Sequence, residues 1–271
     1  MAGQRFAGRI AIATGSTQGV GEALLHHLVD EGLSGAVVTG RDEDRGARVC
    51  AALADKGCET VFVAADLGNA EDVAALIEAA DHQFGRIDHL ANCAGITDRG
   101  DVWDTSPELF DRMMAVNVRA PFQLIQGVAH IARRNDRAAS VVNVGSVAGY
   151  GGAPFITPYS ISKGALMTMT KSVAYQLMRN HIRVVTVNPG WMDTPGEDTI
   201  QRKYHGATDG WLEDAEANQP FGRLIKTAEL VRTLAFVLSD DAGMMTGAII
   251  DYDQSVQGAG NQPVPPEEVR G

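Results

Sequence analysis

The sequence predicts an α/β fold in which a doubly wound parallel sheet carries helices on both faces. Short apolar runs rich in β-branched residues alternate with helical stretches along most of the 271 residues. Strands that are apolar on both faces pair in parallel, because helices then cover both sides of the sheet. Right-handed crossovers between successive strands build the doubly wound arrangement.

The elements follow one another without a linker or a low-complexity stretch, so one domain over 1–271 is expected. Seven strands are expected, at residues 10–14, 36–39, 60–64, 89–92, 140–145, 184–188 and 248–251. Helices are expected between them, at residues 20–31, 43–56, 70–84, 107–134, 158–180 and 227–238.

Two segments stand apart from this alternation. Residues 193–220 show weak hydrophobic periodicity and many polar side chains, which favours a lid over the site. Residues 257–271 contain Pro263, Pro265 and Pro266, and they are expected to form an irregular tail.

The composition excludes several classes of protein. A formal net charge of −11 argues against a nucleic-acid-binding protein, whose surface is normally basic. No run approaches the ~20 apolar residues of a membrane helix, and the amino terminus has no apolar signal segment, so a cytoplasmic protein is expected. Three cysteines without paired spacing and seven scattered histidines match no metal-site pattern, so no metal is expected.

A glycine-rich turn, TGSTQGVG at residues 14–21, joins the first expected strand to the first helix. Glycines there permit a tight turn and bring backbone N–H groups close to a pyrophosphate at the helix N-terminus. Many α/β proteins also need glycine at such a junction for packing alone. The position after the first strand of a parallel sheet favours phosphate binding and a Rossmann-type fold.

Tyr159 and Lys163 are four residues apart behind Pro158, so they lie on one face of one expected helix. A phenol has an ordinary pKa near 10, and a nearby ammonium is expected to lower the pKa of Tyr159. That change would make Tyr159 a usable general acid or base at neutral pH. Taken alone, the pair has an alternative interpretation as two exposed helical side chains.

Two further polar residues stand at informative places. Ser146 follows a strand at its carboxyl end, where open α/β sheets bind ligands, and its hydroxyl can orient a substrate carbonyl. It is equally suited to capping a helix or forming a turn. Asn117 interrupts an apolar helical stretch, and a buried amide there must find partners, either in the fold or in a water relay.

The spacing T-G-x3-G-x-G resembles that of the short-chain dehydrogenase/reductase family, in its subgroup of shorter single-domain members. Later stretches agree with this resemblance, and Cys93 replaces the second Asn of one family motif. The agreeing stretches are Asp66-Leu67, Asn92-Cys93-Ala94-Gly95, Tyr159-x3-Lys163 and the turn Pro189-Gly190-x3-Thr194.

The resemblance implies roles for four candidate catalytic residues. Tyr159 is the acid/base, and Lys163 binds the nicotinamide ribose and tunes Tyr159. Ser146 positions the substrate oxygen, and Asn117 holds a water that connects Lys163 to solvent. The resemblance also implies cofactor contacts from Gly15, Ser16, Thr17, Gln18, Gly19, Val20, Gly21, Arg41, Asp66, Leu67, Asn92, Ala94, Gly95, Tyr159, Lys163, Pro189, Gly190, Met192 and Thr194.

The end of the second strand bears on the choice between NAD and NADP. Folds that prefer NAD usually place an acidic residue there, which accepts hydrogen bonds from the ribose 2′-hydroxyl. Gly40 occupies that place, and Arg41 follows with a guanidinium that suits a 2′-phosphate. The alternatives are that Arg41 pairs with Asp42 or Asp44, or stacks on adenine. A second NADP cue of the family, a basic residue before the middle glycine, is replaced by Gln18. NADP(H) is favoured over NAD(H).

These features predict an oxidoreductase that transfers hydride between a nicotinamide cofactor and an alcohol or carbonyl carbon of a small molecule. Aromatic side chains beside acidic ones in the expected lid suit a sugar or polyol, because each hydroxyl needs a partner. Those lid residues are Trp191, Tyr204, His205, Trp211, Asp193, Glu197, Asp198 and Gln201. Surface side chains of a mobile loop are the alternative interpretation.

Three other functions stay open from the sequence. One is reduction of a 3-oxoacyl group or another hydrophobic ketone by NADPH. Another is an epimerase or dehydratase that recycles bound NAD, against which the short chain and the turn spacing count. The third is a non-catalytic dinucleotide-sensing protein, which the complete catalytic set disfavours. A homotetramer or homodimer is implied by the family resemblance.

Overall fold

The computed structural model describes residues 4–257. Its main sheet has seven strands, all parallel, in the order β3-β2-β1-β4-β5-β6-β9. The strands are β1 Ile10–Ala13, β2 Gly35–Gly40, β3 Glu59–Ala64, β4 His89–Asn92, β5 Ala139–Val144, β6 Ile182–Pro189 and β9 Ile249–Tyr252. The strand order reverses between β1 and β4, and the crevice at such a reversal is where ligands bind in open α/β sheets. The predicted doubly wound fold is confirmed.

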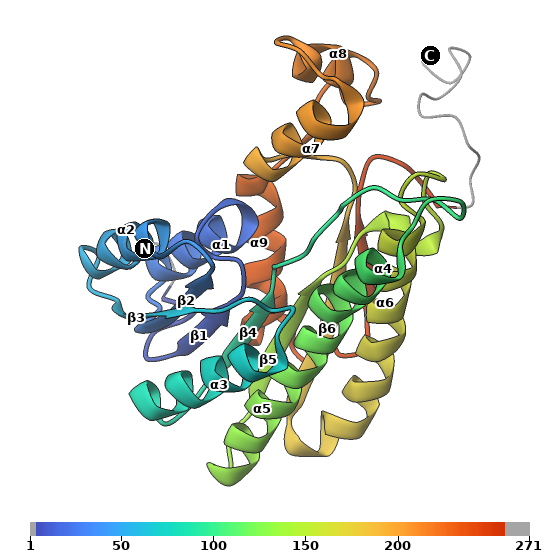
Figure 1. Cartoon of the computed structure of the whole chain (residues 1–271). Coiled ribbons are helices and arrows are strands. Elements are labelled where there is room, and N and C mark those ends of the chain that lie inside the picture. Colours follow the sequence, from blue (N-terminus) through green and yellow to red (C-terminus); the bar gives the residue numbers. More distant parts are fainter. Residues whose placement is uncertain (1–3, 258–271) are drawn as a thin grey trace, which may run out of the picture.

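Helices cover both faces of this sheet, as Figure 1 shows. One face carries α1 Gly19–Asp30, α2 Glu43–Ala54 and α9 Thr227–Leu238. The other carries α3 Ala70–Phe84, α5 Ala120–Arg134 and α6 Thr157–Leu177. Each face buries its own apolar cluster against the sheet, which is why the strands are apolar on both sides.

The helix expected over 107–134 is not regular along its length. It consists of α4 Pro107–Met114, a π-helical segment Ala115–Arg119 and α5, with Ser106 capping the amino end through its side chain. A π-helical turn inserts one extra residue and re-aims the side chains that it carries. The residue so placed is Asn117, which is buried.

The segment 193–220 is more regular than its weak periodicity indicated. It contains α7 Pro195–His205 and α8 Trp211–Ala217, framed by the short strands β7 Met192–Asp193 and β8 Ile225–Lys226. These helices are mostly exposed. Because they bury no apolar stripe, their sequence shows no clear helical period of apolar residues. Both helices stand above the sheet, at the top of Figure 1. Of the expected tail 257–271, all but Gln257 lies outside the described residues.

Candidate active site

The glycine-rich turn between β1 and α1 has a steric reason for two of its glycines. Gly15 adopts φ +63°, and a Cβ there would lie 3.1 Å from the Cα of Ala94. A Cβ on Gly21 would lie 2.8 Å from the carbonyl oxygen of Thr14. A side chain at either position would push α1 or the end of β4 out of place, so the turn stays open only with glycine.

The turn is also tied to the strand beside it. The hydroxyl oxygen of Thr14 accepts hydrogen bonds from the N–H groups of Cys93 and Ala94, each at 3.0 Å. Gln18 is the N-cap of α1, and its side chain caps none of the helix N–H groups. Uncapped N–H groups at a helix N-terminus, on a turn that packs closely because Gly15 and Gly21 carry no Cβ, fit the pyrophosphate of a dinucleotide.

A cleft of about 260 Å³ runs along this turn to the ends of β2 and β3. Its lining includes Gly15, Thr17, Gln18, Gly19, Val20, Gly21, Arg41, Asp66, Leu67, Ala94, Gly95 and Thr194. These are twelve of the positions that the sequence assigns to the cofactor. The structure thus brings the turn, the ends of three strands and the start of α7 to one cleft.

Two expected cofactor contacts face the interior instead. Ser16 is fully buried, and its Oγ accepts the N–H of Thr39 at 3.0 Å, so it fastens the turn to β2. Asn92 is buried as well, and its Nδ2 donates to Asn143 Oδ1 on β5 at 2.8 Å. Both side chains are therefore engaged within the fold, and the cofactor contacts assigned to Ser16 and Asn92 stay predictions for their backbone.

Arg41 is exposed at the rim of the cleft. Within residues 4–257 it forms no ion pair with a carboxylate. Arg45 takes the nearby acid instead, because its Nε lies 3.1 Å from Asp42 Oδ2. Arg45 also donates to the side chain of Gln18. The alternative in which Arg41 pairs with Asp42 or Asp44 is therefore wrong for the described residues, and its guanidinium is available to an anionic ligand.

The helix α6 carries Tyr159 and Lys163 on the side that faces the sheet. The Lys163 Nζ donates to the carbonyl oxygen of Val144, the last residue of β5, at 2.8 Å. The same Nζ lies 5.6 Å from the centre of the Tyr159 ring. The pair is therefore not an exposed helical pair, since Lys163 is buried against the carboxyl end of β5.

Ser146 reaches this pair through a tight local structure. It is the N-cap of the short 3₁₀ helix Val147–Tyr150, and its Oγ accepts the N–H of Ala148 at 3.1 Å. Its own N–H donates to Asn188 Oδ1 at 3.2 Å. Asn188 is fully buried and is a positioning residue that the sequence did not single out, although its place before Pro189 at a strand end was a signal.

The local pKa values follow mainly from burial. Burial raises the pKa of Tyr159, and a hydrogen bond with Ser146 and the charge of Arg99 oppose this shift in part. Burial also lowers the pKa of Lys163 to about 8. The pKa of Tyr159 is thus raised, contrary to the lowered value expected from the sequence, because burial outweighs the hydrogen bond and the opposing charge while Glu197 adds to the upward shift.

Asn117 binds the backbone of the loop after β4. Its Oδ1 accepts the N–H of Ile96 at 2.9 Å, and its Nδ2 donates to the carbonyl oxygen of Ile96 at 3.0 Å. The same Nδ2 lies 3.0 Å from Ser162 Oγ on α6. The π-helical segment thus fastens this loop to the helix of Tyr159, and both Asn117 and Lys163 flank Gly95.

A second cleft, of about 590 Å³, is lined by Ser146, Tyr159 and Lys163. Pro189, Gly190, Met192 and Thr194 line it too, as do the polar side chains of Arg99, Glu197, Gln201 and His205. Among the expected lid residues with aromatic rings, Trp191 also lines this cleft. Tyr204 donates instead to Asp98 at 2.6 Å, and Trp211 donates to Asp198 at 2.8 Å. Neither ring lines the cleft.

Comparisons with known proteins agree with this geometry. A family model described as enoyl-(acyl carrier protein) reductase matches residues 15–256. An uncharacterized oxidoreductase of Thermotoga maritima is 33% identical over 92% of this chain and 97% of its own. None of the helices in residues 4–257 combines the length and apolar character needed to cross a membrane.

Two solved structures share the fold. L-sorbose reductase from Gluconobacter frateurii, complexed with NADPH and L-sorbose, superposes with a TM-score of 0.86 at 25% identity, over 95% of this chain and 99% of that one. A 3-ketoacyl-(acyl-carrier-protein) reductase from Brucella melitensis, complexed with NADH, gives 0.81 at 30% identity, over 92% and 98%. Because the family model spans nearly the whole chain and the motifs meet along its clefts, the protein belongs to the short-chain dehydrogenase/reductase family of nicotinamide-dependent enzymes acting on alcohols and carbonyl compounds.

Proposed function

We propose that the protein catalyses reversible hydride transfer between NADP(H) and the alcohol or carbonyl carbon of a small hydroxylated molecule. One observation carries the proposal. The cleft that holds Ser146, Tyr159 and Lys163 shares Val20, Cys93, Gly95 and Thr194 with the cleft along the glycine-rich turn. A dinucleotide seated on the turn thus has a continuous path to the proton-transfer residues.

The chain's own residues supply position and protons. Tyr159 is the general acid of carbonyl reduction, and its raised pKa keeps the phenol protonated at neutral pH until a substrate oxygen develops charge. Ser146 Oγ, fixed by its backbone contacts, donates a second hydrogen bond to that oxygen. Lys163 presents a cation on the cofactor side. The bound nicotinamide supplies or accepts the hydride.

The preference for NADP(H) rests on Arg41. Its guanidinium lies at the cleft rim without a carboxylate partner in residues 4–257, while Arg45 compensates Asp42. A guanidinium binds a 2′-phosphate through paired, charge-assisted hydrogen bonds. The likeness to L-sorbose reductase with bound NADPH supports this choice, whereas the 3-ketoacyl reductase was solved with NADH.

The substrate cleft favours a hydroxylated ligand. Glu197, Gln201 and His205 reach it from α7, so the segment 193–220 supplies hydrogen-bonding groups above Tyr159. We assign this segment the role of a lid on that ground. A site built to pair substrate hydroxyls rejects ligands that leave its polar groups unpaired. The likeness to a sorbose reductase agrees with a sugar or polyol over a purely apolar ketone.

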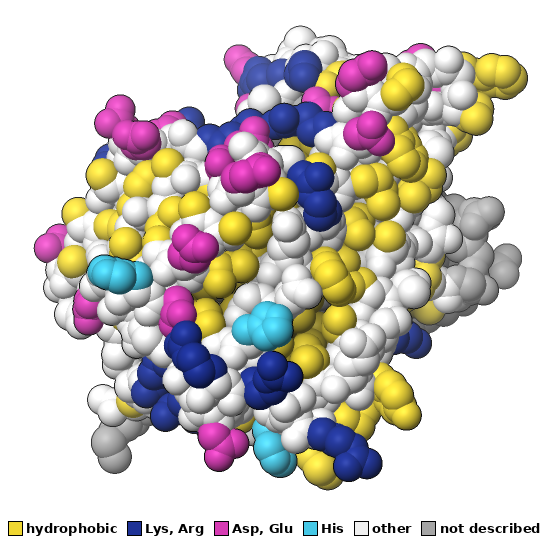
Figure 2. Space-filling model, turned by 60° about the horizontal axis from the view of Figure 1, so that its bottom comes forward, with side chains coloured by type: hydrophobic (Ala, Val, Ile, Leu, Met, Phe, Trp, Pro, Cys, Tyr) yellow, Lys and Arg dark blue, Asp and Glu magenta, His cyan; other side chains and the backbone are white. Residues whose placement is uncertain are grey.

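The assembly proposed is a homodimer or homotetramer. Hydrophobic side chains gather in a band on the right-hand half of Figure 2. The groove between the helices α4, α5 and α6 is lined by Met114, Val118, Phe122, Ala165 and Met169, and Phe122 is exposed. An exposed apolar surface of this kind is typical of an interface between subunits. Sedimentation analysis of the protein and of Phe122→Asp tests it, since dissociation of the variant is expected.

The test of function is a panel of sugars, polyols, 3-oxoacyl thioesters and simple ketones with NAD(H) and NADP(H), followed at the reduced-nicotinamide absorbance. Tyr159→Phe should lower kcat by at least about 10³-fold, because the proton-transfer group is lost, while NADPH binding persists. Tyr175→Phe, on the exposed side of the same helix, is the matched control. Near-normal turnover by Tyr159→Phe contradicts the mechanism.

Three outcomes would point to the other functions. Conversion of a nucleotide sugar without net change in added cofactor would indicate an epimerase or dehydratase. Tight NADPH binding with no turnover of any alcohol or carbonyl compound would indicate a dinucleotide-sensing protein. Faster turnover of 3-oxoacyl thioesters than of sugars or polyols would replace the hydroxylated substrate with an acyl one.

A further inference from the structure

Arg99 is a half-buried cation in the wall of the substrate cleft. Over residues 4–257 no carboxylate oxygen lies within ion-pair distance of its guanidinium. Two other arginines near the sheet edge do have such a partner, as Arg112 does in Asp66 and Arg45 does in Asp42. Withdrawing a cation from water without an opposite charge costs free energy, so the position calls for an anion from outside the chain.

The guanidinium is held in one orientation. Its Nε donates to His205 Nε2 at 3.0 Å, and its Nη1 donates to the carbonyl oxygen of Thr97 at 3.0 Å. Its carbon lies 5.5 Å from the centre of the Phe155 ring, which covers one face of the group. Two of the five guanidinium N–H groups are thus used, which leaves three, including both on Nη2.

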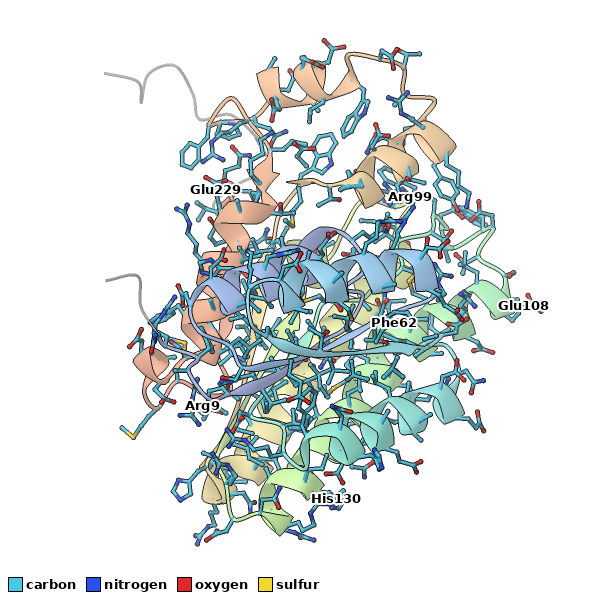
Figure 3. All side chains as sticks on the ribbon, turned by 90° about the vertical axis from the view of Figure 1, so that its left-hand side faces the viewer. Arg9, Phe62, Arg99, Glu108, His130 and Glu229 are labelled. Atoms are coloured by element: carbon cyan, nitrogen blue, oxygen red, sulfur yellow. The ribbon has the colours of Figure 1, made fainter. Side chains whose placement is uncertain are left out.

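The loop that carries Arg99 is fixed at both ends. Asn117 binds both backbone groups of Ile96 on one side. On the other side, the N–H of Gly100 donates to Phe155 at 2.9 Å, and its carbonyl oxygen accepts from Thr157 at 3.1 Å. Figure 3 shows Arg99 just below α7, on the side of that helix that faces the sheet. Arg99 is therefore pre-positioned and needs little ordering to bind a ligand.

Two acidic residues in the surroundings of Arg99, its sequence neighbour Asp98 and the cleft residue Glu197, are engaged elsewhere. Asp98 accepts from the hydroxyl of Tyr204 at 2.6 Å and pairs with Lys203 at 3.3 Å. Glu197 lines the same cleft as Arg99, and its Oε1 accepts from Trp191 at 2.8 Å and from Gln201 at 2.7 Å. Neither acid neutralises Arg99, so the cleft keeps a positive group on one wall and an acid on another.

We infer that the substrate carries a carboxylate, which Arg99 binds through its free N–H groups while the reacting alcohol or carbonyl carbon lies at Tyr159. The inference rests on the proposed function and narrows its substrate to hydroxy acids and oxo acids. A carboxylate fits one planar fork, with two parallel hydrogen bonds. A phosphate dianion is disfavoured, because one guanidinium neutralises only half of its charge and the cleft also contains the carboxylate of Glu197.

The test compares each acid with its own amide, which keeps the shape and removes the charge. The probes are lactate, 3-hydroxybutanoate, 4-hydroxypentanoate and gluconate with their carboxamides, and glycerol 3-phosphate as the phosphate arm. This series varies the distance between the carboxylate and the reacting carbon. We expect kcat/KM for at least one acid to exceed that for its amide about 10- to 100-fold, which corresponds to the free energy of a hydrogen bond to a charged group.

Variants assign the preference to Arg99. Arg99→Gln should bring the acid-to-amide ratio close to one, and Arg99→Lys should keep part of it, since the charge stays and the fork is lost. Arg202→Gln removes the same charge from the exposed side of α7, where Arg202 pairs with Asp198, and should keep the ratio. Competition by cyclohexanecarboxylate, but not by its amide, against a neutral alcohol checks the same site without the acid as substrate.

The outcomes separate this inference from the proposed function. If amides and neutral alcohols are turned over as well as acids, and Arg99→Gln leaves the ratio unchanged, the carboxylate inference is overturned and the oxidoreductase function stands. Preference for glycerol 3-phosphate over every acid overturns it in favour of a phosphate. If no acid is turned over while a sugar, polyol or ketone is, this inference is overturned and the oxidoreductase function stands. If none of the acids, amides, sugars, polyols, thioesters or ketones is turned over with either cofactor, the proposed function fails and this inference fails with it.

Discussion

A Cβ added to Gly149 would lie 2.9 Å from the carbonyl carbon of Lys163, so the 3₁₀ helix after Ser146 packs directly on the backbone of α6. The reverse contact is equally close, since a Cβ on Gly164 would lie 3.0 Å from the carbonyl oxygen of Gly149. This contact between two glycines brings Ser146 to Tyr159, although the two residues are on different elements. The arrangement of the proton-transfer residues therefore depends on backbone packing.

Gly149→Ala should lower kcat/KM on the order of 10²-fold, because the added methyl clashes with the backbone of α6 and moves Ser146 relative to Tyr159 by up to about 1 Å. NADPH binding, measured by fluorescence, should change little, because the glycine-rich turn is not touched. Unchanged kcat/KM in this variant would show that the contact does not position Ser146.

Asn117→Ala should lower the free energy of unfolding by about 2 kcal/mol, because the N–H and carbonyl groups of Ile96 lose their buried partner. Urea unfolding measures this change. Asn218→Ala, at the exposed end of α8, is the control and should leave stability within about 0.5 kcal/mol. Activity lost at unchanged stability would instead favour the water-holding role that the family resemblance implies.

Arg41→Gln should raise the Kd for NADPH about 10- to 100-fold relative to the Kd for NADH, since only NADPH carries the 2′-phosphate. Titration calorimetry with both cofactors gives the ratio. Arg48→Gln removes a charge from an exposed position of α2 and should leave the ratio as it is. A wild-type protein that binds NADH more tightly than NADPH would contradict the assignment of the cofactor.

Stability should fall at mildly acidic pH because of His89. Its Nδ1 lies 2.8 Å from Ser140 Oγ, which donates its own proton to the carbonyl oxygen of Leu238, so Nδ1 carries the imidazole proton. Burial lowers the pKa of His89 from 6.5 to about 4. Between these values the unfolded chain binds the extra proton and the folded chain does not, so lowering the pH favours unfolding.

The expected decrease in the free energy of unfolding due to His89 is small above pH 6.5 and reaches about 3 kcal/mol near pH 4. The difference between wild type and His89→Asn in urea unfolding, followed from pH 7 to pH 4, isolates this contribution from the carboxyl groups. The exposed His130→Asn should follow the wild-type curve. Parallel curves for wild type and His89→Asn would contradict the prediction.

The sequence by itself determined the fold class, the strand succession and the chemistry of the cofactor turn, because these depend on local patterns. Apolar runs and helical periods are readable in a single chain, and the helix Thr227–Leu238 has the bounds that its sequence predicts. The Tyr159-x3-Lys163 spacing placed both side chains on one helix face. The weakly periodic α7 and α8 were missed, because exposed helices need no apolar stripe.

Only the tertiary structure decided which polar side chains reach the clefts. Ser16 and Asn92 belong to motifs of the cofactor site, yet each is buried against a neighbouring strand. Arg99, in contrast, belongs to no motif, and it lines the substrate cleft because Asn117 and Phe155 hold its loop from elements far along the chain. Whether a side chain is buried or its charge is neutralised depends on residues that are distant in the sequence, so no local pattern of residues predicts it.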